Sequence, residues 1–442
     1  RDPEMSRGLG DVYKRQKLIN INSLLKTLII ILLALYTLVF MFKSHGCKGS
    51  HGKIRRLDSG AFVLGCGVLQ SVIQLIIVIV LCFTKLNGWR FLANALCAYA
   101  ITTLLCLSGI VRIAASARQV KILWYVILLF TWYIPLVNCI VFRKFYKAAR
   151  SEYYFEQAKL DLDAARKENE ICKTKYPILM VHGIFFRDWQ VINYWGRVPN
   201  ELIRNGAEVY YGKQQSANKV SVSATEVAER IKEVIAETGA EKVNIIAHSK
   251  GGLDSRYAIS HLGMDKYVAT LTTINTPHYG CKFVDMLLGK IPESIQSFVD
   301  RKYNKLFTAL GDKDPSFLDG VYDLTYKNCS ELNASTPDSQ LVSYRSVMSK
   351  MNSIRSAGFP LNIGYLLNKP YGNGNDGLVT VESGLYGENS KMIEHKGKRG
   401  ISHGDVIDLF RENIKDFDVR EFYVDIVKAV SYTHLRAHET SQ

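Results

Sequence analysis

The stretch Glu241-Lys-Val-Asn-Ile-Ile-Ala-His-Ser-Lys-Gly-Gly252 decides the fold of the second half of this chain. Its first half has the apolar, β-branched residues of a buried parallel strand, and its two glycines begin a helical pattern. Ser249 therefore lies at a strand-to-helix turn, in a small-x-Ser-x-Gly pattern with Ala247 in the first small position. Such a turn exposes the serine hydroxyl, and the Lys250 amide at the helix N-terminus can donate a hydrogen bond to an oxyanion. A plain strand-to-helix turn is the alternative.

Strands alternate with helices on both sides of this turn. The patterns predict strands at 176–181, 208–211 and 268–274, and helices near 195–205 and at about 225–237. This alternation predicts an α/β fold with a mostly parallel sheet covered by helices on both faces, which binds ligands at the carboxyl ends of its strands. Gly183 directly follows the first strand, so the amide of Ile184 is the natural second donor to an oxyanion.

A serine nucleophile needs a general base and a carboxylate that orients the base, and in this fold they follow it in the order Asp or Glu, then His. Asp376, in the turn Asn373-Gly-Asn-Asp-Gly-Leu-Val379, is the expected carboxylate, and an ordinary Gly/Asn-rich turn is the alternative. Of the six histidines between 176 and 429, only His395 and His403 follow it. We expect His403, because an apolar helical pattern follows it, whereas His395 lies among charged residues typical of a solvated loop.

Four uncharged apolar segments occupy the first third of the chain, at 27–42, 59–84, 91–111 and 122–142. A helix needs ~20 apolar residues to cross the apolar core of a bilayer, so these segments predict a four-span membrane region over 17–142. Pro135 and Asn138 in the fourth segment are expected to be tolerated within a membrane helix. The Ala-, Glu- and Lys-rich stretch 143–175 predicts a juxtamembrane helical linker, and 176–429 a globular domain.

The formal net charge of +15 invites a nucleic-acid partner, so the position of the charge matters. Between Lys43 and Ser151, fourteen Lys and Arg residues face a single acid, Asp58, and they flank the apolar segments. The basic residues therefore suit a bilayer surface, and no nucleic-acid partner is expected. Lys and Arg are equally frequent on the loops of the two sides. The sequence thus predicts an integral, multi-pass membrane protein whose globular domain could face either side.

Both ends of the chain resemble one sequencing adapter. Asp11–Gln16 can be encoded by an adapter end whose reverse complement, in a shifted frame, encodes Val430–Leu435. We therefore expect 1–16 and 430–442 to be adapter-derived artefacts and exclude them from the fold.

From Pro177 to about Asp285 the domain resembles the catalytic core of secreted, calcium-dependent bacterial triacylglycerol lipases of the α/β-hydrolase superfamily. The resemblance extends to a later turn and to a histidine with an aspartate two residues on. The matching motifs are Ile178-Leu-Met-Val-His-Gly183, Lys242-Val-Asn-Ile-Ile-Ala-His-Ser249, Gly251-Gly-Leu253, Thr273-Ile-Asn-Thr-Pro-His278, Asn375-Asp-Gly-Leu-Val379, and His403 with Asp405.

By this resemblance, Ser249, Asp376 and His403 form a catalytic triad, and the Ile184 and Lys250 amides form the oxyanion hole. The implied activity is hydrolysis of carboxylic esters of lipids, acylglycerols among them, through an acyl-enzyme, and this chemistry requires no cofactor. Asp405 matches a calcium ligand of those lipases, so the resemblance implies a structural calcium ion, although a second aspartate ligand upstream of Asp376 is not evident. The chain from 17 to 175 lies outside the resemblance.

Three alternatives remain at this point. The segment 283–326 has apolar residues at near-helical spacing and is either a lid that opens at a lipid surface or an ordinary cap helix. The same triad can pass the acyl group to an alcohol, which would make the protein a membrane lipid acyltransferase. A non-catalytic membrane scaffold with a hydrolase-like domain is the third, against which the intact Ser249, Asp376 and His403 argue. No pattern indicates an oligomeric state.

Overall fold

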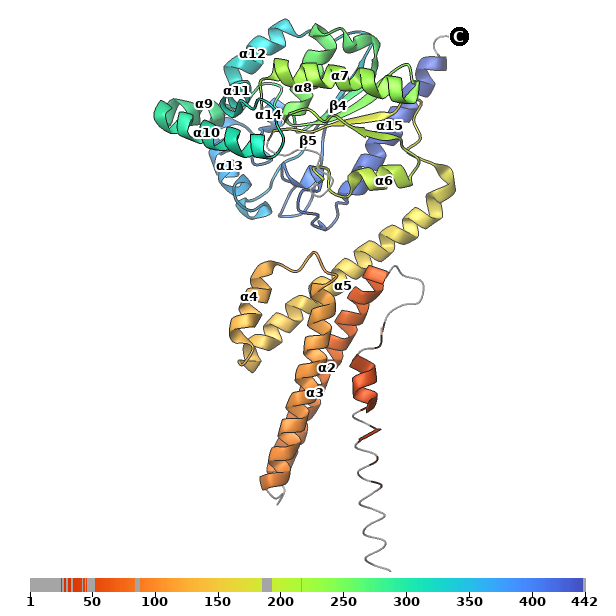
Figure 1. The fold of residues 1–442 in the computed structure, drawn as a ribbon, viewed down its shortest axis with the longest axis vertical. Coiled ribbons are helices and arrows are strands. Elements are labelled where there is room, and N and C mark those ends of the chain that lie inside the picture. The colour runs from red at the N-terminus through yellow and green to blue at the C-terminus, as the bar shows by residue number, and fades with distance from the viewer. Residues whose placement is uncertain are drawn as a thin grey trace, which may run out of the picture. The chain divides into compact units, whose positions relative to one another are not determined.

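The computed structural model describes residues 25, 28, 31–32, 35–41, 43, 45, 52–83, 88–184, 193–215 and 217–439, without the side chains at 90, 135–136 and 432–439. The chain forms two compact units, Arg1–Asp161 and Leu162–Gln442 (Figure 1). The predicted artefact at 1–16 and much of the first apolar segment lie outside the described residues.

A six-stranded sheet is the centre of the second unit. Its order is β2-β1-β3-β4-β5-β6, and each neighbouring pair is parallel. This agrees with the α/β fold that the alternating pattern predicts, and it places the ends of β1, β3 and β4 side by side. The strands are β1 (Ile178–Val181), β2 (Val209–Tyr211), β3 (Val243–His248), β4 (Val268–Ile274), β5 (Ser343–Met348) and β6 (Ser390–Met392).

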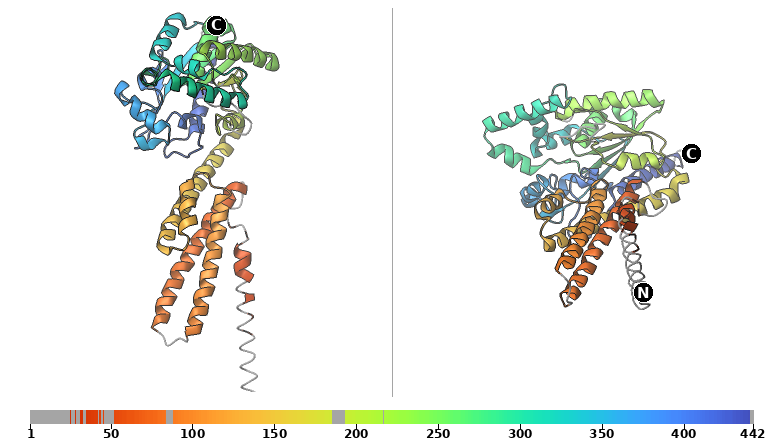
Figure 2. Two further views of the ribbon diagram at one scale, coloured as in Figure 1. Left: turned by 60° about the vertical axis from the view of Figure 1, so that its left-hand side comes forward. Right: turned by 60° about the horizontal axis from the view of Figure 1, so that its bottom comes forward.

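Helices cover both faces of this sheet (Figures 1 and 2). Alternate residues of β1 point to opposite sides, and each set enters a separate core. Ile178 and Met180 share one core with residues of α6 (Val198–Arg204) and α15 (Val419–Glu439). Leu179 and Val181 share the other with α7 (Val220–Thr238) and α8 (Lys250–His261). The sheet is therefore buried on both sides, as parallel sheets are.

The predicted insertion at 283–326 is helical. Between β4 and β5 lie α9 (Lys282–Lys290), α10 (Glu293–Ala309), α11 (Phe317–Tyr322) and α12 (Tyr326–Ser335). α10 is two-sided, because Phe307 is buried while Ile295, Phe298 and Leu306 are exposed. Shorter elements complete the unit: α13 (Leu361–Asn368), α14 (Val381–Gly384), and 3-10 helices at Lys167–Asn169, Met264–Lys266, Ile354–Ser356, Lys369–Tyr371 and Asp405–Ile407.

The first unit contains two long apolar helices, α2 (Gly52–Cys82) and α3 (Gly88–Ala114). In the described residues, these two are long and apolar enough to cross a membrane by length and composition. They pack closely through glycines, since a Cβ atom at Gly109 would lie 2.7 Å from the Leu64 amide nitrogen. Small residues at such contacts are typical of helices that associate in membranes.

The fourth predicted span is not a single helix. α4 (Ile122–Thr131) ends after ten residues, about 15 Å of helix. A new helix, α5 (Pro135–Arg166), then begins at a proline, which has no N–H to donate and suits a first helical turn. The Asn138 side chain donates to the Trp132 carbonyl oxygen at 2.6 Å across this break. The prediction of one spanning helix over 122–142 is therefore wrong, and two long helices remain as candidate spans.

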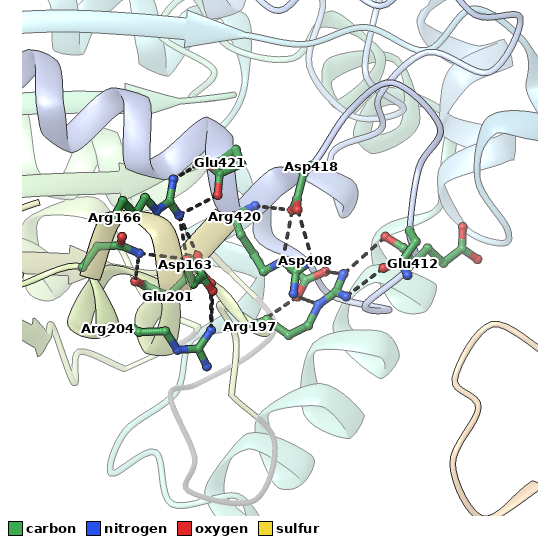
Figure 3. A network of polar contacts seen from close by, with 12 residues as sticks. Asp163, Arg166, Arg197, Glu201, Arg204, Asp408, Glu412, Asp418, Arg420 and Glu421 are labelled. Carbon is green, nitrogen blue, oxygen red and sulfur yellow. Dashed lines mark hydrogen bonds and ion pairs between the residues drawn. The ribbon is translucent and has the colours of Figure 1, made fainter. Parts of the chain in front are cut away.

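The second unit begins at Leu162, earlier than the predicted boundary at 176. The reason is a group of buried ion pairs around Arg166, in the last turn of α5 (Figure 3). Arg166 donates to Asp163 at 2.9 Å, to Glu201 of α6 at 3.0 Å and to Glu421 of α15 at 2.6 and 2.8 Å. At the other end, α15 continues to Glu439 and includes most of 430–442, whose origin as an artefact stays a prediction.

Candidate active site

Ser249 lies between β3 and α8 and has an unusual backbone conformation. Its φ is 54° and its ψ is −132°, a region that costs a non-glycine residue about 1–3 kcal/mol. The Ser249 N–H donates to the Ile274 carbonyl oxygen at the end of β4, and its carbonyl accepts from the Gly252 N–H, both at 3.0 Å. The neighbouring strand and the helix thus hold the strained turn that is typical of a nucleophile elbow.

Close backbone packing explains the glycines around this turn. A Cβ atom at Gly251 would lie 2.3 Å from the His182 carbonyl oxygen, and one at Gly183 would lie 2.8 Å from Ser249 Cβ. Neither distance is compatible with a side chain. The loop after β1 therefore lies directly against the serine, which is where a donor to its reaction intermediate is needed.

The predicted base and its predicted carboxylate are in direct contact. His403 Nδ1 lies 2.6 Å from Asp376 Oδ2, and the exposed fractions of the two side chains are 9% and 0%. The backbones are joined as well, because the His403 N–H donates to the Asp376 carbonyl oxygen at 2.8 Å. A carboxylate at Nδ1 keeps a proton on that nitrogen, so Nε2 is the nitrogen free to accept a proton.

Neutral donors hold the Asp376 carboxylate. Its Oδ1 accepts from the N–H groups of Leu378 and Val379 at 2.8 and 2.7 Å. Its Oδ2 also accepts from Asn275 Nδ2 at 2.6 Å. Asn275, which has φ 49°, is fixed just beyond β4 by two hydrogen bonds with Ser349. Such donors favour the ionised form of a buried carboxylate without a cation. This role of Asn275 was not predicted from the sequence, although the residue lies in the motif that follows β4.

The His403 ring packs against the ring of His248, the residue before Ser249. The centroids of the two imidazole rings are 4.5 Å apart, and His248 directly precedes the serine. Burial lowers the pKa of His248 well below its usual value, so this ring stays neutral. Among the described residues, no hydrogen bond joins Ser249 Oγ to His403. In unliganded enzymes such bonds are often long and shorten when substrate binds.

A buried tyrosine positions the loop that carries the predicted donor Ile184. The Tyr194 hydroxyl accepts from the Gly183 N–H at 3.0 Å and lies 2.6 Å from His248 Nδ1. Tyr194 therefore connects the loop after β1 to the end of β3. This contact was not predicted, because no local sequence pattern indicates a contact between residues 54 positions apart.

The side chain of Lys250 is engaged within the α7–α8 layer. Its Nζ donates to Asp254 Oδ1 at 2.7 Å and to Ser223 Oγ at 3.0 Å, and it is almost fully buried. Burial raises the pKa of Asp254 to about 7. The backbone amide of Lys250 is the part of this residue that suits the predicted role, since the first N–H groups of a helix have no partner within the helix.

The surroundings of Asp405 do not fit a calcium ion. Both of its carboxylate oxygens accept from the Arg399 guanidinium, at 2.9 and 3.1 Å. One of them also accepts from the N–H and the hydroxyl of Ser402, at 2.8 and 2.7 Å. Calcium needs six to eight oxygen ligands. The Arg399 guanidinium already supplies the positive charge beside this carboxylate, and in the part of the chain that the structure describes Asp405 belongs to no group of three metal-ligating side chains.

One group of carboxylates in the described residues has metal-ligand spacing, namely Asp163, Glu201 and Glu421. The Arg166 guanidinium binds all three, and Arg204 adds a second cation at 2.8 Å from Asp163 (Figure 3). Ion pairs that fasten α5 to α6 and α15 therefore account for this cluster.

A parallel sheet with a serine in a strained strand-to-helix turn, followed along the chain by a paired aspartate and histidine, is the arrangement of the α/β-hydrolase class. Residues 175–298 match the model of a protein family described as "Putative serine esterase (DUF676)". Over these residues the domain is therefore similar to serine esterases.

Two triacylglycerol lipases are similar in sequence. That of Burkholderia plantarii is 32% identical over 190 residues, which cover 40% of this chain and 52% of the lipase. That of Pseudarthrobacter phenanthrenivorans is 33% identical over 180 residues, which cover 38% and 56%. The chain therefore spans about half the length of these curated relatives. The Staphylococcus hyicus lipase structure is similar with a TM-score of 0.46 and 18% identity, and the match covers 59% of this chain and 97% of that one.

Proposed function

We propose that this protein is a membrane-anchored serine hydrolase that cleaves carboxylic esters of lipids. Ser249 is the nucleophile, His403 the general base and acid, and Asp376 the carboxylate that orients His403. The observation that carries the proposal is the buried contact between His403 Nδ1 and Asp376, beside a serine in a strained turn. Similarity to triacylglycerol lipases supports a lipid ester as the substrate.

The first half of the reaction forms an acyl-enzyme. Ser249 Oγ attacks the ester carbonyl carbon while His403 Nε2 takes the hydroxyl proton. The negative oxygen of the tetrahedral intermediate accepts hydrogen bonds from the amides of Ile184 and Lys250. The bond to the leaving alcohol then breaks, and His403 gives its proton to the alcohol oxygen.

The second half releases the acid. Water attacks the acyl carbon, His403 takes a proton from the water, and this proton returns to Ser249 Oγ as the carboxylic acid departs. Asp376 stays ionised throughout and stabilises the imidazolium that forms in each half. Its three neutral donors support this role, because they favour the ionised carboxylate without neutralising its charge.

The helices over the oxyanion loop support a lipid substrate. Ile184 belongs to an apolar cluster with Phe307 of α10 and Phe317 of α11, so these helices pack against the residue that bears a donor amide. The opposite side of α10 exposes Ile295 and Phe298. A helix with apolar side chains on both sides suits a lid that faces the site when closed and a lipid surface when open, and we assign this role to 283–326.

Membrane anchoring is part of the proposal. α2 and α3 support it by their length and apolar composition, and the basic residues that flank the apolar segments suit a bilayer surface. A third span, over the first apolar segment at 27–42, is part of the proposal on the strength of its sequence alone.

The test compares the full chain in detergent micelles with its Ser249→Ala variant. We expect the wild type to hydrolyse p-nitrophenyl butyrate, p-nitrophenyl palmitate and emulsified triglyceride. Ser249→Ala should lower kcat by more than about a thousandfold, because loss of the nucleophile removes the acyl-enzyme route. An alkyl fluorophosphonate should label the wild type but not this variant. Ser330→Ala, on the exposed face of α12, is the matched control and should keep full activity.

Two results would contradict the proposal. A folded wild type that neither hydrolyses these esters nor reacts with the fluorophosphonate would favour the scaffold function. Transfer of the acyl group to an added alcohol in preference to water would favour a lipid acyltransferase.

A further inference from the structure

The loop that carries His403 contains a guanidinium group, that of Arg399, to which the proposed reaction assigns no role. Arg399 lies four residues before His403, and its Nη1 and Nη2 bind the two oxygens of Asp405, two residues after it. Nη2 also donates to Glu412 Oε2 at 2.6 Å. The pair Arg399–Asp405 therefore closes the loop on both sides of the histidine.

Asp405 in turn fixes the tight turn around His403. Its Oδ2 accepts from the Ser402 N–H and hydroxyl, and its own N–H donates to the Ser402 carbonyl oxygen at 3.0 Å. Ser402 directly precedes His403, so the backbone on this side of the imidazole is held by the Asp405 carboxylate. The side chain of Asp405 is 6% exposed, and such a buried charge requires a partner of opposite sign.

Arg399 is itself anchored through its backbone. Its carbonyl oxygen accepts from the Asn352 N–H at 3.0 Å and from the Ser356 hydroxyl. The next residue, Gly400, has φ 71°, and a Cβ atom there would lie 2.5 Å from the Asn352 nitrogen. This close approach to the neighbouring loop fixes the position of Arg399 independently of Asp405.

We propose that Arg399 is a positioning residue for His403, and that its guanidinium replaces the divalent cation as the partner of Asp405. The bidentate geometry supplies the charge and direction that a bound ion would supply. Among the described residues, Asp405 belongs to no cluster of three metal-ligating side chains, and Glu412 is bound to the same guanidinium. This inference rests on the proposed esterase function, and it implies activity that is independent of calcium.

The experiment measures ester hydrolysis and thermal unfolding of the full chain in EGTA and in CaCl2. For the wild type we expect kcat and Tm to be the same in both. Arg399→Gln should lower kcat by about 10- to 100-fold with little change in KM, because a displaced base slows the chemistry while the substrate still binds. Arg399→Lys, which keeps the charge but loses the bidentate contact, should recover part of kcat.

Arg230→Gln is the matched control. Arg230 also binds two carboxylates, those of Glu233 and Glu237, but it does so on α7, apart from the His403 loop. This variant should keep the wild-type kcat.

Three results would overturn the inference: loss of wild-type activity in EGTA with recovery in CaCl2, a CaCl2-dependent rise in Tm, or an Arg399→Gln variant with the wild-type kcat. Should the wild type show neither hydrolysis nor fluorophosphonate labelling, the proposed function fails instead. The Tm measurement then still tests the replacement of the cation, since an unchanged Tm supports it and a calcium-dependent rise contradicts it.

Discussion

Two carboxylates hold His403, and their charges are stabilised in different ways. Asp376 accepts hydrogen bonds from Asn275 and from two backbone N–H groups, none of which carries a full charge. Asp405 accepts from the guanidinium of Arg399. Both side chains are buried and lie within hydrogen-bonding reach of the His403 ring or its backbone neighbours.

The difference separates two tasks. A carboxylate held by dipoles keeps its net negative charge, so it can stabilise an imidazolium. A carboxylate paired with a guanidinium forms a neutral unit that fixes geometry but contributes little field. We therefore expect Asp376 to act on the charge of His403 and Asp405 to act on its position.

The largest expected effect tests that division directly. Asp376→Asn should lower kcat by about 10³- to 10⁴-fold, because an amide favours the wrong imidazole tautomer and cannot stabilise the imidazolium. Asp405→Asn should cost far less, about tenfold, because it affects position alone. Steady-state kinetics on a p-nitrophenyl ester, with circular dichroism to verify folding, gives both values. Equal losses in the two variants would remove the distinction.

A smaller effect is expected from the donor to Asp376. Asn275→Ala removes a hydrogen bond to a charged group, which contributes about 1.5–3 kcal/mol, so kcat should fall by roughly 10- to 100-fold. The backbone donors Leu378 and Val379 remain in this variant. A kcat within twofold of the wild type would show that the backbone donors suffice.

The smallest effect concerns the stability of the protein and depends on a third carboxylate, Asp254. This carboxylate is buried and accepts a hydrogen bond from the Lys250 ammonium group. Burial raises its pKa from 3.8 to about 7, so the folded protein retains a proton that the unfolded chain loses near pH 4. The stabilisation from this proton is complete below about pH 4 and is lost as the pH rises through about 7. Asp254→Asn should therefore lose less stability than the wild type between pH 4 and 7, as measured by Tm at each pH. Parallel Tm curves would contradict the raised pKa.

Much of the fold and several site residues could be predicted because their signals are local. The strand and helix patterns around Ser249 agree with the structure, and the strand predicted at 268–274 has those same limits. Asp376 and His403 were selected by chain order and flanking pattern, and they are in contact in the structure. Their catalytic roles, like the donors Ile184 and Lys250, remain proposals.

The missed residues act over distances that a local pattern does not encode. Asn275 and Asp376 are 101 positions apart, so their hydrogen bond depends on the tertiary fold and not on either motif. Arg399 is only six residues from Asp405, and the basic loop before His403 was visible, but its cation was not matched to that acid. The break before Pro135 was missed because apolar composition alone does not distinguish one long helix from two.

The ion pairs at the end of α5 determine where this protein can be divided for recombinant work. A fragment that begins at 176 lacks Arg166 and leaves Glu201, whose side chain is 1% exposed, without its main cationic partner. Removing one member of a buried pair costs about 3–5 kcal/mol, a large part of the stability of an ordinary domain. Expression fragments of the hydrolase domain should therefore start at or before Leu162, even though the resemblance to lipases begins fifteen residues later, at Pro177.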